Sequence, residues 1–95
     1  MYTIDYICAS ITNDHRPRRE PTKKADLLRT LRERGKNPRL HRFRLLDDDQ
    51  TPYFYGWSTT ASTEAAFWPL DEVGAAYGCT IIEYRDERTG KYREL

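Results

Sequence analysis

A pair of strand-like segments joined by an acidic turn is the feature that most constrains how this chain folds. Residues 39–46 (RLHRFRLL) and 53–59 (YFYGWST) can each be divided into two alternating faces, as half-buried strands can. Residues 47–52 (DDDQTP) predict a turn, because aspartate side chains bond to local backbone and proline disfavours ladder pairing. The pattern therefore predicts a β-hairpin and, with it, an antiparallel sheet.

Other segments of the chain also have the composition of strands. Residues 2–10 divide into two alternating faces, and Tyr2, Ile4, Tyr6 and Cys8 are expected to share one of them. Residues 79–85 (CTIIEYR) predict another strand, and residues 91–95 a short edge strand after a turn. These segments give the hairpin its expected neighbours.

Two helical regions are expected between the strands. The first begins at Thr22, whose hydroxyl can cap a helix, and ends at Gly35. From Ser62 onward the chain predicts two short helical pieces, because Pro69 and Gly74 oppose one continuous helix. The apolar stripe of the first helix is narrow, so we expect this helix to pack on one side only. That stripe consists of Leu27, Leu28 and Leu31.

The expected order of elements is strand, helix, strand, strand, short helix, strand. This order predicts an α+β fold, with an antiparallel sheet covered on one face by one main helix and a short second helical segment. A ferredoxin-like β-α-β-β-α-β arrangement fits the order. A twisted meander of three or four strands crossed by one helix is the alternative. A chain of 95 residues is expected to form a single domain, residues 1–95.

The charges are divided unequally along the chain. Residues 1–44 contain twelve Lys and Arg and five Asp and Glu, which sum to +7. Residues 45–95 contain four basic and ten acidic residues, which sum to −6, and nine of the twelve aromatic residues. Charge asymmetry between halves points to a charged partner.

We expect a soluble, cytoplasmic protein without a cofactor or a metal. Cys8 and Cys79 are too far apart for a zinc motif and are expected to be reduced. No run approaches the roughly 20 apolar residues of a membrane span. Asp5 interrupts the apolar stretch near the start, so we expect no signal peptide.

Residues 42–84 carry four short motifs: RLLDDD (44–49), YFYG (53–56), FWPLD (67–71) and GCTIIEY (78–84). In these motifs the chain resembles a set of small uncharacterised open reading frames from bacteria, their phages and plasmids. The resemblance implies a charged strand, an acidic turn, an aromatic strand, a proline-containing loop and a closing strand. It implies no catalytic residue, and it implies a context of small accessory proteins of mobile elements, including inhibitors of host defence.

Catalytic groups are sparse in this sequence. Nucleophilic catalysis needs a base beside the nucleophile, and only His15 and His41 could supply a neutral imidazole. His41 is flanked by arginines, which disfavour its protonated form. No G-x-S-x-G, P-loop or Cys-His arrangement occurs. We therefore expect a protein that is not an enzyme; a hydrolase or metal-dependent enzyme using residues 47–49 with His41 is the catalytic alternative.

Three adjacent carboxylates lie at the tip of the expected hairpin. A calcium loop spaces its ligands at alternating positions, so we interpret the run as a solvated turn rather than a metal site. Aromatic residues are frequent hot spots of protein interfaces, and an acidic rim beside them would set the orientation of a partner. The predicted partner-binding set is Asp47, Asp48, Asp49, Tyr53, Tyr55 and Trp68.

A basic patch is expected near the first helix, where such groups could contact phosphates. An RNA-recognition-like platform would use rings of the first strand and of residues 53–57. Packing of those rings in the core is the favoured interpretation, because a small domain needs their apolar area inside. The predicted basic patch is Arg16, Arg18, Arg19, Lys23 and Lys24.

The leading functional hypothesis is a small non-enzymatic binding or inhibitor protein carried by a phage or another mobile element. It would dock on a nucleic-acid-handling host protein, such as a nuclease or a CRISPR effector, in the anti-CRISPR or anti-restriction manner. The alternative is a nucleic-acid-binding accessory module that uses the basic N-terminal half. The sequence does not identify the partner.

Overall fold

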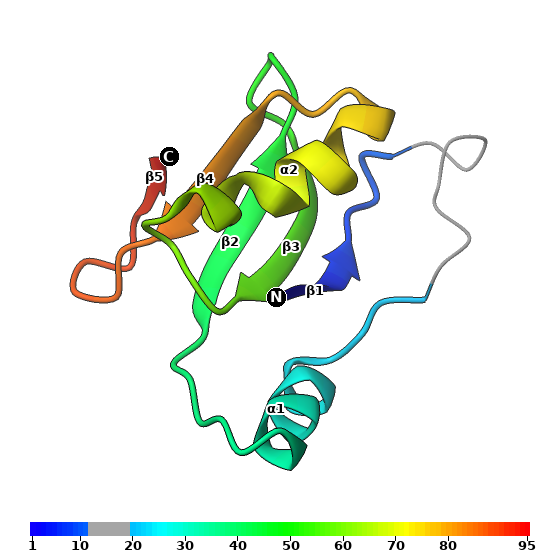
Figure 1. Ribbon diagram of the computed structural model, residues 1–95. Coiled ribbons are helices and arrows are strands. Elements are labelled where there is room, and N and C mark those ends of the chain that lie inside the picture. The colour runs from blue at the N-terminus through cyan, green and yellow to red at the C-terminus, as the bar shows by residue number, and fades with distance from the viewer. Residues whose placement is uncertain (12–19) are drawn as a thin grey trace.

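The computed structural model describes residues 1–11 and 20–95, which form a five-stranded antiparallel sheet with short helices around it (Figure 1). In Figure 1, α2 lies across the front of the sheet and α1 lies below it. Within the described ranges, no helix is long and apolar enough to cross a membrane. The elements are β1 (Tyr2–Ile7), α1 (Lys24–Glu33), β2 (His41–Leu46), β3 (Pro52–Ser58), η1 (Glu64–Phe67), α2 (Trp68–Glu72), η2 (Gly74–Tyr77), β4 (Ile81–Arg85) and β5 (Tyr92–Glu94).

The predicted hairpin and the α+β class are confirmed. β2 and β3 pair along their length and are joined by the acidic turn. The second helical region is not one continuous helix, as predicted, but it has three short pieces, η1, α2 and η2, where two were expected. Pro69 lies in the first turn of α2, and Gly74 begins η2. The start of α1 differs, because Lys23 occupies the N-cap position. Thr22 instead donates its backbone N–H to the carbonyl of Ile4, which partly covers the free edge of β1.

The strand order is β1-β3-β2-β4-β5, so the ferredoxin-like order is not found. β1 and β2 lie on either side of β3 and are connected through α1, as in a ferredoxin-like fold. β4, however, pairs with β2 on the far side and not with β1. The two crossovers, from β1 to β2 and from β3 to β4, therefore move across the sheet in the same direction. They start from strands that run in opposite directions, because β1 and β3 are antiparallel. Because such crossovers are right-handed, the two helices belong on opposite faces of the sheet, not on one face as expected.

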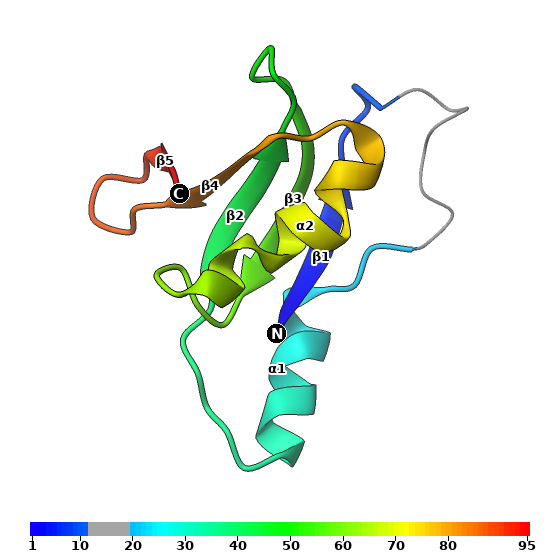
Figure 2. The ribbon, with the colours of Figure 1, turned by 45° about the horizontal axis from the view of Figure 1, so that its top comes forward.

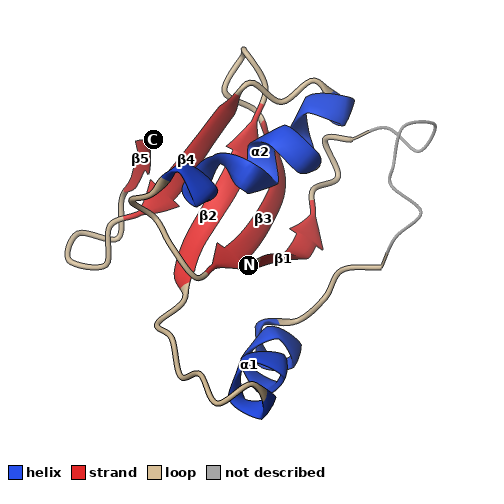
Figure 3. Ribbon diagram, viewed as in Figure 1, coloured by secondary structure: helices blue, strands red, loops and turns tan. Residues whose placement is uncertain are grey.

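The main core lies between the sheet and residues 64–77, which contain η1, α2 and η2. Phe43 and Phe54 are fully buried there. The hydroxyl of Tyr84 donates to the carbonyl of Ala66 at 2.8 Å and ties the helical segment to β4. Burial of such side chains stabilises the fold by about 1.5–3 kcal/mol each. Figure 3 shows that this short helical segment, and not the longer α1, covers the sheet.

A bulge at Asp5 changes which side chains of β1 face the core. The register with β3 shifts between Ile4 and Tyr6. An extra residue reverses the alternation that follows it, so Ile4 and Ile7 are both buried in the core. Tyr6 lies on the opposite face and is 56% exposed. The prediction that Ile4 and Tyr6 share a face is wrong, because a strict two-residue alternation takes no account of the extra residue in a bulge.

α1 packs on a second, smaller apolar cluster. Leu27 and Leu31 are buried with Leu40, and Leu28 and Trp57 pack against them. Trp57 alternates along β3 with core-facing residues, so it projects from the face opposite the main core. Figures 1 and 2 show α1 beyond one end of the sheet. Among residues 1–11 and 20–95, no helix covers the rest of that face.

Candidate functional site

The face of the sheet opposite α2 gathers tyrosine, tryptophan and arginine side chains from four strands. Tyr55 of β3 lies between Tyr6 of β1 and Arg44 of β2. Trp57 lies opposite Arg42 in the same way, and β5 contributes one further ring. We name this surface the aromatic–arginine face; it consists of Tyr6, Arg42, Arg44, Tyr55, Trp57 and Tyr92.

Ion pairs hold both arginines in place. Nη1 of Arg42 donates to the two carboxylate oxygens of Asp5 at 2.8 and 2.7 Å. Nε1 of Trp57 donates to the same carboxylate at 3.1 Å. Nε of Arg44 donates to Oε1 of Glu83 at 2.6 Å. The four charged side chains are only 17–26% exposed, so these charge-assisted bonds are strong and orient the guanidinium groups before any partner binds.

The arginines also cover the faces of neighbouring rings. The guanidinium carbon of Arg42 lies 5.2 Å from the ring centroid of Tyr55 and 5.0 Å from that of Trp57. The guanidinium carbon of Arg44 lies 4.2 Å from the centroid of Tyr92. Burial alone would lower the pKa of Arg44, but its hydrogen bonds to Glu83 and Tyr55 outweigh burial and raise that pKa. Arg44 therefore stays charged in contact with the ring.

The rings contact one another edge to face. Tyr55 packs against Tyr6 and against Tyr92, with 6.2 Å between ring centroids in both pairs. Nζ of Lys24 lies 4.0 Å from the ring centroid of Trp57 and connects α1 to the network. Each cation–π contact contributes about 0.5–2 kcal/mol, and each aromatic pair about 0.5–1.5 kcal/mol. The aromatic–arginine face is thus a single network of linked side chains.

This network suits a protein partner better than a single-stranded nucleic acid. Base stacking needs an accessible ring face, and cations of the chain itself lie over three of the four rings. Asp5 and Glu83 within the surface would also repel phosphates. Tyrosine, tryptophan and arginine are the residues that dominate protein hot spots, and a preorganised surface loses little entropy on binding.

The acidic run that the sequence singled out is largely used to build the hairpin turn. Oδ1 of Asp47 accepts hydrogen bonds from the backbone N–H groups of Asp49 (3.0 Å) and Thr51 (2.9 Å). The bond from Thr51 is the main cause of a lowered pKa of Asp47. Asp48 accepts a hydrogen bond from the hydroxyl of Thr80 at 2.5 Å. Asp48 and Asp49 are both exposed, and within the described part of the chain the carboxylate of Asp49 has no such hydrogen bond.

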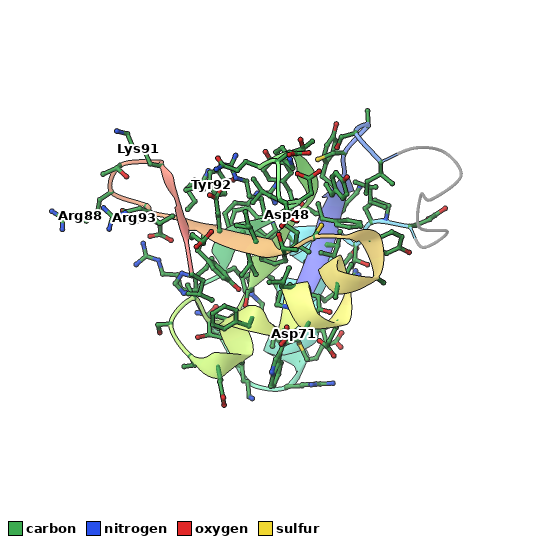
Figure 4. All side chains as sticks on the ribbon, turned by 90° about the horizontal axis from the view of Figure 1, so that it is seen from above. Asp48, Asp71, Arg88, Lys91, Tyr92 and Arg93 are labelled. Carbon is green, nitrogen blue, oxygen red and sulfur yellow. The ribbon has the colours of Figure 1, made fainter. Side chains whose placement is uncertain are left out.

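The aromatic members of the predicted set lie in different places. Tyr53 packs against the main core, Tyr55 belongs to the aromatic–arginine face, and Trp68 projects from α2. Figure 4 places Asp71 of α2 and Tyr92 of β5 on opposite sides of the sheet. The sheet therefore separates Tyr55 from Trp68, and the predicted set does not form one surface. Core packing is also wrong for Tyr55, which is half-buried on the open face.

The side of the molecule that carries α2 is acidic and has exposed rings. Phe67 is 39% exposed and Trp68 is 49% exposed. The chain has no Lys or Arg between residues 45 and 84. Acidic residues of the second half therefore gather at α2, whereas on the opposite face Arg44 of the basic half pairs with Glu83 of the acidic half. We name the surface around α2 the acidic side; it consists of Glu64, Phe67, Trp68, Asp71 and Glu72.

The predicted basic patch is only partly described. Arg16, Arg18 and Arg19 lie outside the described residues. Lys23 is exposed at the N-cap of α1, and Lys24 lies over Trp57. One member of the patch is thus connected to the aromatic–arginine face.

The groups of the catalytic alternative are not brought together. His41 begins β2 and Asp47 follows its last residue, so the strand separates them by about 20 Å. Burial raises the pKa of Cys79 to about 12, which keeps its thiol protonated near neutral pH. Within residues 1–11 and 20–95, no group of three His, Cys, Asp or Glu side chains is arranged to hold a metal ion.

His41 gives a testable dependence of stability on pH. Partial burial, and then the charge of Arg39, lower its pKa below the usual value of about 6.5. A lowered histidine pKa means that the unfolded chain binds the proton more readily, so stability falls as pH drops through about 6.5. Between about pH 7.5 and 5.5, the wild type should lose more unfolding free energy than His41→Gln in urea titrations. Equal losses in the two proteins would contradict this assignment.

Several residues of the aromatic–arginine face were not identified from the sequence. Tyr92 was hidden in a short terminal strand, and Arg42 and Arg44 were counted only as positive charges. The available signal was the alternation of 39–46, which places Arg42 and Arg44 on one face of a strand beside the rings of 53–59. The predicted hairpin pairs these two strands, but its register, which the structure supplies, is what brings Arg42 next to Trp57 and Arg44 next to Tyr55.

No protein-family model, curated protein or solved structure matches this chain.

Proposed function

We propose that this chain is a small non-enzymatic binding protein that docks on a partner protein through the aromatic–arginine face. The observation that carries the proposal is the network of Tyr55, Arg42 and Arg44 with its neighbours on the sheet face opposite α2. Arginines fixed by Asp5 and Glu83 need little reordering to bind. Such a surface can supply the few large contacts that dominate binding energy.

We further propose that binding inhibits a nucleic-acid-handling host protein, such as a nuclease or a CRISPR effector, on behalf of a phage or another mobile element. The resemblance of residues 42–84 to open reading frames of such elements supports this role. The acidic side, defined above, lies opposite the docking face; its negative charge would steer the encounter with a basic nucleic-acid-binding protein rather than supply the contacts.

The test compares two double variants that remove exposed rings from opposite sides of the sheet. Tyr6→Ala/Tyr92→Ala alters the aromatic–arginine face, and Phe67→Ala/Trp68→Ala is the matched control on the acidic side. Tagged proteins are used to capture partners from a lysate of the bacterial host, at low and moderate salt. The partner recovered with the wild type is then purified and titrated against each variant.

We expect the variant of the aromatic–arginine face to bind the partner at least about 30-fold more weakly, the loss caused by removing a hot-spot contact of about 2 kcal/mol. The control variant should retain affinity within a few-fold. If the control variant lost affinity and the variant of the aromatic–arginine face kept it, the partner would bind the acidic side and the proposed docking face would be refuted. Recovery of nucleic acid without any protein would instead favour the nucleic-acid-binding alternative.

A further inference from the structure

A groove lies between α1 and the Trp57 end of the aromatic–arginine face. Its volume is about 670 Å³, and the apolar side chains of Leu28, Leu40 and Trp57 are among the lining residues. Its rim is strongly charged, since α1, the segment after it, β4 and the β4–β5 turn all contribute. We name it the basic groove; its charged residues are Lys24, Arg32, Arg39, Arg85 and Glu87.

The basic groove has guanidinium groups available for a ligand. Arg39 forms an ion pair with Glu87, which neutralises one of the four cations. Arg32 and Arg85 are exposed, and within residues 1–11 and 20–95 neither forms an ion pair. Lys24 lies over the ring of Trp57. The groove thus combines apolar side chains with unpaired cations, which suits a ligand that has both negative charge and apolar groups.

We infer that the basic groove receives a short acidic segment of the partner protein. Carboxylates of that segment would pair with Arg32 and Arg85, and an apolar side chain between them would contact Leu28 and Trp57. This inference rests on the proposed function, because Trp57 belongs both to the groove and to the aromatic–arginine face. A partner seated on that face would extend directly into the groove.

Two observations favour an acidic peptide over a nucleic acid. The groove is bounded by the carboxylate of Glu87 and lies beside Asp5, so free positive charge is confined to a short stretch and does not form a track for successive phosphates. The indole of Trp57 is covered by Lys24 and Arg42, so its face cannot stack on a base. Planar guanidinium groups, in contrast, match carboxylates with two parallel hydrogen bonds.

The experiment is a titration of the isotope-labelled protein with a short peptide of alternating glutamate and leucine residues, followed by the two indole N–H resonances in heteronuclear NMR spectra. Trp57 donates its indole N–H beside the groove, whereas Trp68 lies on the other side of the sheet and serves as an internal control. A Trp68→Phe variant assigns the two signals. We expect the Trp57 signal to shift with saturation and the Trp68 signal to stay in place. The shift should weaken as salt is raised, because the attraction between charges is screened.

Two double variants with the same loss of charge test the location. Arg32→Gln/Arg85→Gln removes both unpaired cations of the groove, and Arg29→Gln/Arg88→Gln removes two exposed arginines that do not line it. We expect at least about tenfold weaker peptide binding in the groove variant and little change in the control. No saturable shift of Trp57, or equal losses in the two variants, would overturn the inference.

A single-stranded oligothymidylate provides the competing arm. If it displaces the peptide at a lower concentration than the peptide needs for half-saturation of the Trp57 shift, the groove binds nucleic acid and the inference is overturned. Failure of the peptide alone, with partner capture still dependent on Tyr6 and Tyr92, would refute only this inference. Loss of that dependence would refute the proposed function.

Discussion

Gly56→Ala is expected to destabilise the domain by at least about 3 kcal/mol, at the upper end of overpacking effects. Gly56 pairs with Ile4 on one side and with Phe43 on the other, in the centre of the sheet. A Cβ atom there would overlap the carbonyl oxygen of Thr3 and the ring of Phe43, whose Cε2 atom would lie 2.8 Å away. Neither group can yield without separating β1 from β3 or displacing a fully buried ring.

The measurement is thermal unfolding followed by circular dichroism. For a domain of this size, a loss of 3 kcal/mol corresponds to a fall in Tm of roughly 12–24 °C, within a total stability of about 5–14 kcal/mol. Gly74→Ala is the matched control, because Gly74 is also buried but its nearest neighbours, led by Cys79, would lie 3.0–3.2 Å from the new atom. We expect a clearly smaller fall for the control. Equal Tm values for Gly56→Ala and the wild type would show that β1 does not approach β3 this closely.

Asp5→Ala is expected to lower the free energy of unfolding by about 2–3 kcal/mol, between the values for exposed and buried ion pairs. The substitution removes the carboxylate that accepts hydrogen bonds from Arg42 and Trp57. The side chain of Arg42 is only 17% exposed, so its charge would remain largely buried without a counterion. An unpaired buried charge costs more than the lost bond itself contributed.

A double-mutant cycle with Arg42→Met separates these terms. Methionine fills a similar volume between Tyr55 and Trp57 without a charge, so Asp5→Ala/Arg42→Met should be more stable than the sum of the single effects predicts. Urea denaturation of the four proteins gives the coupling energy. Strict additivity would mean that the Asp5 carboxylate and the Arg42 guanidinium do not interact in solution, and the fixed geometry of the aromatic–arginine face would lose its main support.

The local elements of this fold could be predicted because their causes are local. The alternation of 39–46 and 53–59 around an acidic turn is sufficient for a hairpin, and the structure contains it. Pro69 and Gly74 oppose one continuous helix, and the structure has short pieces in which Pro69 lies in the first turn of α2 and Gly74 begins η2. Short-range geometry and backbone preferences decide these features, so they can be derived from the chain alone.

The candidate site could not be predicted in the same way, because it depends on strand order and on one bulge. Asp5 turns Tyr6 away from the core and places its own carboxylate beside Arg42. Tyr92 reaches Arg44 only because β4 and β5 lie beyond β2. The predicted docking set failed to form one surface because Trp68 lies on the covered side of the sheet and Tyr55 on the open side.

The sequence by itself determined the antiparallel hairpin, the α+β class and the uneven division of charge along the chain. The tertiary structure alone decided where those charges meet. Placing β4 beside β2 puts α1 and α2 on opposite faces, which separates the acidic side from the aromatic–arginine face. The physical reason is that a one-dimensional pattern specifies which side chains share a strand face, whereas the neighbours of that face are set by the packing of distant segments.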